Sequence, residues 1–106
     1  MTTFAFEFDP RLGIELPRMS GEWDDLPAEE RARILLRWEE IRGRIPDRIK
    51  ELERAIMAKQ AQLDAEEDFR RSCALNSEIA DLASVINDLH IWYRTGQDME
   101  DGKAHR

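Results

Sequence analysis

The fold of this chain is decided by residues 75–93, LNSEIADLASVINDLHIWY. Apolar residues recur there at spacings of four, three, four, three and four, at Leu75, Ile79, Leu82, Ile86, Leu89 and Tyr93. This spacing is typical of one face of an α-helix that packs against another helix. The sequence therefore predicts a helix that ends near Gly96, and we expect these residues and Trp92 to form a protein-binding or oligomer interface.

A second apolar seam precedes this one and is formed by Ile49, Leu52, Ile56 and Leu63. Extending it by heptads leads to Arg70 and Ser77, so the two seams are out of phase. A reversal of the chain within residues 64–74 would let the seams face each other, whereas one unbroken helix would not. We therefore expect an antiparallel, coiled-coil-like helical hairpin of residues 46–66 and 70–95, with one long helix as the alternative.

A shorter helix is predicted before this hairpin, over residues 27–44. Pro27 suits a first helical turn, and the apolar residues that follow have a helical period: Ile34, Trp38, Ile41 and Ile45. Gly43 and Pro46 are residues that commonly end or kink a helix. The sequence therefore predicts a stop between this helix and the next.

The first 26 residues differ from the rest of the chain, because apolar and polar residues alternate there. The alternating apolar residues are Phe4, Phe6, Phe8, Leu12, Ile14 and Leu16. A period of two favours extended structure, and Asp9-Pro10-Arg11 is plausible turn chemistry. We expect an N-terminal arm that is either a β-hairpin or irregular and extended, and a flexible polar tail over residues 96–106.

Together these elements predict an all-α domain that carries an N-terminal arm. The apolar surface exceeds what one helical hairpin can bury, which favours a homo-oligomer such as a four-helix bundle made by two copies. The alternative is that the shorter helix and the arm cover this surface within one chain.

Composition places the chain among single-domain cytoplasmic proteins. Its 106 residues suit one domain, and Cys73 has no second cysteine with which to form a disulfide. No apolar run approaches the ~20 residues that cross a bilayer, and no signal peptide or membrane association is expected. The net charge of −7 divides into −6 for residues 1–30, +4 for residues 31–59 and −5 for residues 60–106, which predicts that the basic middle neutralises its acidic flanks.

An arginine stripe within the basic middle is a candidate anion-binding surface, formed by Arg33, Arg37, Arg44 and Arg48. Glu40 and Glu51 share this helix face, so we expect salt-bridged surface in preference to a phosphate site. Binding of nucleic acid, which needs an uncompensated basic surface, is not expected.

Glu78 and Asp81 are the candidate metal ligands. The run Glu78-x-x-Asp81 resembles the second motif of the all-α nucleotide pyrophosphohydrolases, which implies a phosphohydrolase that holds magnesium through carboxylates. The first motif of that family, Glu-Glu-x-x-Glu, is not matched, because Glu66-Glu67 is followed by Arg70. An ordinary solvated helix face is the simpler interpretation.

The run Ser77-Glu78-Ile79-Ala80-Asp81 is similar to the Ser-Gln-Glu-Leu-Asp signature of small aspartyl-phosphate phosphatases of sporulating bacteria. The middle positions depart from that signature, so the resemblance implies only a possible regulator or phosphatase of a phosphoprotein. His90 and Cys73 have no recognisable catalytic or metal-binding partners in the sequence. We therefore expect a non-enzymatic module that binds another protein and needs no cofactor.

Overall fold

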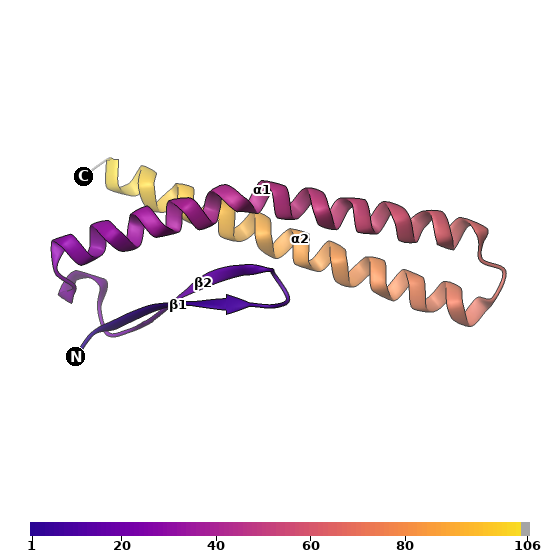
Figure 1. Ribbon diagram of the computed structural model, residues 1–106, viewed down its shortest axis with the longest axis horizontal. Helices are drawn as coiled ribbons and strands as arrows, with labels where there is room; N and C mark the ends of the chain where they lie inside the picture. The colour runs from indigo at the N-terminus through magenta and orange to yellow at the C-terminus, as the bar shows by residue number, and fades with distance from the viewer. Residues whose placement is uncertain (105–106) are drawn as a thin grey trace.

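The protein is a long antiparallel helical hairpin with a β-hairpin packed along one side (Figure 1). The computed structural model describes the backbone of residues 1–104 and the side chains of residues 1–95. Its elements are β1 (Thr3–Asp9), β2 (Ile14–Ser20), the short 3-10 helix η1 (Trp23–Asp25), α1 (Ala28–Ala65) and α2 (Phe69–Ala104). The molecule measures 60 × 27 × 17 Å, and the 38 residues of α1, at about 1.5 Å per residue, span most of its length. The predicted helical hairpin with a hairpin-like arm is confirmed.

The assignment to an all-α class is wrong, because β1 and β2 form an antiparallel pair. The pairing is continuous from Thr3 opposite Ser20 to Asp9 opposite Ile14. A two-stranded hairpin is at most marginally stable in water by itself. Here it is held by burial of Leu12, Ile14 and Leu16 against the helices, so residues that looked like a separate arm belong to the core.

The prediction of a separate shorter helix over residues 27–44 is also wrong, because α1 continues through Gly43 and Pro46 to Ala65. Pro46 lacks the N–H that would bond to the carbonyl four residues earlier, which normally costs a helix about 3 kcal/mol. Pro46 is exposed, whereas the residues on both sides of it are buried at a helical period: Ile41, Ile45 and Ile49. Packing of this stripe outweighs the local cost of the proline.

The reversal between the helices lies within the predicted interval, at residues 66–68. Asp68 precedes α2 and caps it, because its Oδ1 accepts a hydrogen bond from the backbone N–H of Arg70 at 3.3 Å and its carbonyl accepts one from the N–H of Ser72 at 2.9 Å. A side-chain oxygen in this position satisfies a helix N-terminus. The turn therefore needs no glycine.

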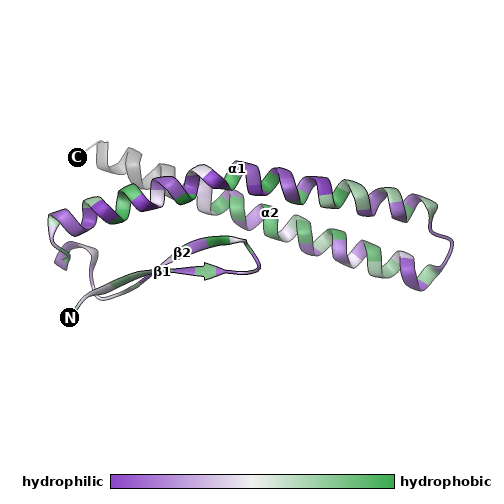
Figure 2. Ribbon diagram, in the orientation of Figure 1, coloured by the Kyte–Doolittle hydropathy of each residue, from purple (hydrophilic) through white to green (hydrophobic). Residues whose placement is uncertain are grey.

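The core lies where the two helices and the β-hairpin meet. Along α1 it contains Trp38, Ile41, Ile45, Ile49 and Leu52; α2 adds Val85 and Leu89, and the hairpin adds Leu12, Ile14 and Leu16. Figure 2 shows hydrophobic residues recurring along both helices, with hydrophilic ones between them. Each of these large side chains contributes roughly 1.5–3 kcal/mol when fully buried. Among the described residues, no β-strand covers the half of the helical hairpin next to its turn (Figure 1).

Helix α2 continues through Gly96 to Ala104, beyond the end that its apolar seam predicts. The flexibility expected for residues 96–106 stays a prediction. The side chains of residues 96–104, and residues 105–106 as a whole, lie outside the described part of the chain.

Candidate functional site

An apolar groove opens between the β-hairpin and the first half of α1. Its volume is 310 Å³, and its walls are Phe4, Phe6, Pro17, Met19, Trp23, Ile34, Leu35, Trp38, Trp92 and Thr95. The hairpin contributes side chains from one face only, because residues directly opposite in an antiparallel pair point to the same side. Phe4 lies opposite Met19 and Phe6 lies opposite Pro17. The helices supply the facing wall.

Aromatic contacts fix the walls of this apolar groove. The rings of Phe4 and Phe6 meet edge to face with centroids 4.9 Å apart, and Trp23 lies 6.4 Å from Phe4. Trp38 and Trp92 meet edge to face at 5.8 Å, which joins α1 to α2. Such pairs contribute about 0.5–1.5 kcal/mol beyond area burial. The apolar groove is therefore held open by packed rings.

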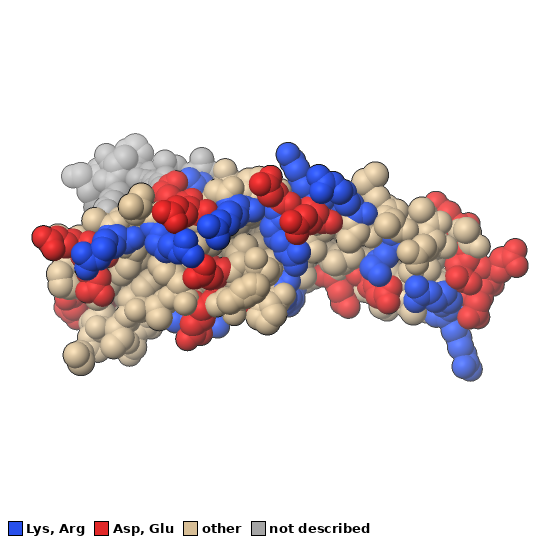
Figure 3. All heavy atoms as spheres, viewed as in Figure 1, with Lys and Arg blue, Asp and Glu red and all other residues tan. Residues whose placement is uncertain are grey.

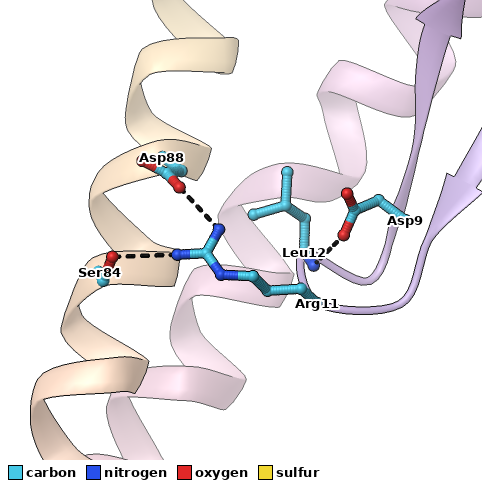
Figure 4. A network of polar contacts seen from close by, with 5 residues as sticks. All are labelled: Asp9, Arg11, Leu12, Ser84 and Asp88. Atoms are coloured by element: carbon cyan, nitrogen blue, oxygen red, sulfur yellow. Dashed lines mark hydrogen bonds and ion pairs between the residues drawn. The ribbon is translucent and has the colours of Figure 1, made fainter.

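The turn of the β-hairpin is fastened to α2 by Arg11 (Figure 4). Its guanidinium donates to Asp88 Oδ2 at 2.7 Å and to Ser84 Oγ at 3.0 Å. Within the turn, Asp9 Oδ1 accepts a hydrogen bond from the N–H of Leu12 at 2.9 Å. The carboxylate of Asp9 thus shapes the turn from which Arg11 reaches the helix.

The other side of the turn is fastened to α1 by Arg48. Its Nε donates to the carbonyl of Leu12 at 2.9 Å, and its Nη1 contacts Glu51 at 3.2 Å. Gly13 has a φ of +76°, and a Cβ there would lie 2.5 Å from Arg48 Nε. The positive φ favours glycine here, and any other side chain would also displace the guanidinium of Arg48.

The arginine stripe divides into residues that hold the hairpin and residues that do not. Arg37 contacts Glu15 of β2 and also Glu40, and the hydrogen bond to Glu40, followed by the charge of Glu15, raises the pKa of Arg37 above its ordinary value. Arg37 and Arg48 therefore hold the β-hairpin against α1, through Glu15 and Leu12 respectively. Arg33 and Arg44 are exposed and contact no carboxylate among the described residues.

The stripe does not form an uncompensated basic surface. A hollow of 630 Å³ includes Arg44 and Arg48, but it is also lined by Glu15, Asp47 and Glu51. Figure 3 shows basic and acidic side chains interspersed along the visible face. An anion placed there would meet carboxylates as well as guanidiniums, so the geometry disfavours a phosphate site.

Glu78 and Asp81 both border a hollow of 490 Å³, together with Arg11, Lys59 and Ser84. Lys59 Nζ lies 3.0 Å from Glu78, and Arg71 lies 3.9 Å from it. Two cations beside this carboxylate compete with a metal ion. Within residues 1–95, no cluster of three or more His, Cys, Asp or Glu side chains has the geometry to hold a metal.

The predicted interface residues of α2 pack inside the chain. Leu75 and Leu89 are fully buried, and Leu82, Ile86, Trp92 and Tyr93 pack against the core. The ring of Tyr93 lies 4.9 Å from the guanidinium carbon of Arg42. Ile79 is half-buried. A role for these residues between two copies stays a prediction.

The sequence did not predict that Pro17, Met19 and Leu35 line one apolar groove. Their only signal is the period-two alternation of the hairpin combined with the helical period of α1, and neither pattern says which faces meet. His90 and Cys73 are exposed on α2 and lie outside the groove.

Comparisons with protein families, with curated proteins and with solved structures give no match to this chain. In the part of the chain that the structure describes, neither helix has the length of apolar sequence that a membrane span needs.

Proposed function

We propose that this chain is a cytoplasmic, non-enzymatic protein-interaction module that binds apolar side chains of a partner protein in the groove beside the β-hairpin. The observation that carries the proposal is the composition of the groove walls. Apart from Thr95, every wall residue is apolar or aromatic. Exposed apolar surface of this kind on a small protein commonly marks a site of interaction.

The surroundings support a binding role over a catalytic one. The carboxylates with the most suggestive spacing, Glu78 and Asp81, lie beside Lys59 and far along α2 from Trp92. The groove offers aromatic anchors, which dominate the energetics of protein interfaces. The free thiol of Cys73 suits a reducing compartment.

Two neighbouring leucines provide a matched test. Leu35 lines the apolar groove, whereas Leu36 is 65% exposed and lies outside its walls. A photo-crosslinking amino acid at Met19 in the source cell identifies the partner, with the same probe at Met57 as the control for nonspecific adducts. Purified partner is then titrated against the chain while tryptophan fluorescence is followed.

We expect Leu35→Asp to weaken binding by about 2 kcal/mol or more, since a charge would enter an apolar contact. We expect Leu36→Asp to bind as the unsubstituted chain does. Equal affinity of the two variants, with both chains folded by circular dichroism, would contradict the proposal.

A further inference from the structure

The two strands of the β-hairpin each have one outer edge, and the register shows which residues present their backbone groups there. In an antiparallel pair, alternate residues bond across to the partner strand while the others point their N–H and C=O outward. Asp9 points inward, because its carbonyl accepts a hydrogen bond from Gly13 at 2.7 Å inside the turn. Since the pairing has no bulge, the backbone N–H and C=O groups of Ala5 and Glu7 also point inward, toward β2. Those of Phe4, Phe6 and Phe8 point outward, away from β2.

The position of Pro17 independently supports this assignment of inward and outward backbone groups. It lies opposite Phe6 and has no N–H, so it fits a position whose backbone does not bond across the hairpin. Pro17 therefore faces outward on β2 and interrupts that edge. The backbone of β2 is also the one that approaches α1, and near the turn it lies between β1 and the helices (Figure 1).

The outer edge of β1 has no such protection. Its seven residues include no proline, and its pairing has no bulge that would twist the edge away. Outside the hairpin, no hydrogen bond of the described residues reaches the backbone of Phe4, Phe6 or Phe8. An unpaired edge of this length is a template for another strand.

We propose that a second copy of this chain pairs with the outer edge of β1, so that two antiparallel β1 strands join the hairpins into one four-stranded sheet. Phe6 is the middle residue of β1, and its backbone groups point outward. A two-fold axis beside Phe6 therefore pairs it with Phe6 of the second copy, and pairs Phe4 of each copy with Phe8 of the other. Each such pair exchanges two backbone hydrogen bonds.

The side chains of β1 complement themselves in this register. On one face the phenylalanines meet phenylalanines, and Phe8, now 59% exposed, gains a cover. On the other face Glu7 lies opposite Ala5 of the second copy, and Asp9 lies opposite Thr3. No like charges are directly opposed. Arg18 lies opposite Ala5 in its own hairpin, one strand away from the incoming Glu7, and contacts Glu7 of its own copy at 3.3 Å. This self-complementarity points to a second copy as the occupant.

This dimer is distinct from the predicted four-helix bundle, because it uses the β-hairpin and leaves the α2 seam inside each chain. It also does not depend on the partner protein proposed for the apolar groove. Either proposal can fail while the other holds, since one is measured with the purified chain alone.

The test is sedimentation velocity of the full chain over a series of concentrations, with two variants of Phe8. Phe8→Pro removes an outward N–H while leaving the inward bonds of the hairpin. Phe8→Val changes the same side chain and keeps the N–H. We expect a concentration-dependent dimer that is weaker in Phe8→Pro than in Phe8→Val by about tenfold or more, because two hydrogen bonds, one from each copy, are lost.

Position 5 tests the register separately. Ala5→Glu would oppose two like charges across the pair of β1 strands, whereas Ala5→Lys would oppose unlike ones. We expect the lysine variant to dimerise more tightly than the glutamate variant, with the difference reduced in high salt. A chain that stays monomeric at every concentration, a dimer unaffected by Phe8→Pro, or equal dimerisation of the two Ala5 variants would overturn the proposal.

Discussion

Arg48 Nε donates a hydrogen bond to the backbone carbonyl of Leu12 across 2.9 Å, which ties the middle of α1 to the turn of the β-hairpin. Arg11 ties the same turn to α2 through Asp88 and Ser84. The turn is therefore held by both helices at once, and Leu12 between these contacts is buried. These bonds explain why a two-stranded sheet persists here and presents a defined groove and a defined edge.

Gly13 and Gly43 are expected to respond to alanine in opposite directions. Gly13→Ala should destabilise the fold by about 1–3 kcal/mol, because its φ is positive and the new Cβ would press on Arg48. Gly43→Ala should stabilise it by about 1 kcal/mol, since the site is inside a helix and, apart from the adjoining helix backbone, no described atom lies within 4 Å of the new Cβ. Urea unfolding at one fixed protein concentration measures both. Similar effects of the two substitutions would contradict the geometry of the turn.

The contact between Arg11 and Asp88 is expected to have a measurable coupling energy. A double-mutant cycle with Arg11→Ala and Asp88→Ala should give about 0.5–1 kcal/mol, at the upper end for exposed pairs, because Arg11 also donates to Ser84. The matched control is Arg18 with Glu7, a pair within the hairpin whose side chains are both more than 60% exposed. We expect its coupling energy to be smaller. The reverse order would show that Arg11 does not fasten the turn.

Pro46→Ala is expected to stabilise the protein by roughly 1–2 kcal/mol. The substitution restores a helical hydrogen bond inside α1, and this gain exceeds the entropy that proline removes from the unfolded chain. Asp47→Ala, at the next exposed position, is the control and should change little. Thermal unfolding followed by circular dichroism distinguishes the two, and a loss of stability in Pro46→Ala would mean that the proline is needed for the shape of α1.

Ile45→Ala is expected to cost about 2–5 kcal/mol, because its side chain is fully buried where the helices and the hairpin meet. Met57→Ala, on the same helix but 66% exposed, should change the free energy of unfolding by less than about 0.5 kcal/mol. Chemical denaturation of both variants gives the comparison. A mild effect at Ile45 would place the core elsewhere.

Local patterns in the sequence were sufficient for the helical hairpin. The regular spacing from Leu75 to Tyr93 predicted α2, and its phase relative to Ile49 and Leu52 predicted a reversal, which the structure places at residues 66–68. The alternation of Phe4, Phe6 and Phe8 predicted extended structure at the N-terminus. Each of these patterns involves residues that lie close together in the sequence, so it can be recognised without knowledge of tertiary contacts.

The errors arose where tertiary contacts decide. Pro46 signalled a helix end, but the buried isoleucines on both sides of it hold α1 together. The expectation of salt-bridged surface at Arg37 and Arg48 did not name their partners, Glu15 and Leu12, because these come from the hairpin far earlier in the chain. The apolar groove was not predicted, because no sequence period records which face of a hairpin meets which face of a helix.

The most direct test of this account is amide hydrogen exchange of β1 at single-residue resolution, at a concentration where the chain sediments as a monomer. The account predicts slow exchange at Ala5 and Glu7, whose N–H groups bond to β2, and fast exchange at Phe4, Phe6 and Phe8, whose N–H groups point outward. Uniformly fast exchange along β1, or slow exchange at the phenylalanines in the monomer, would contradict a docked hairpin with one free edge.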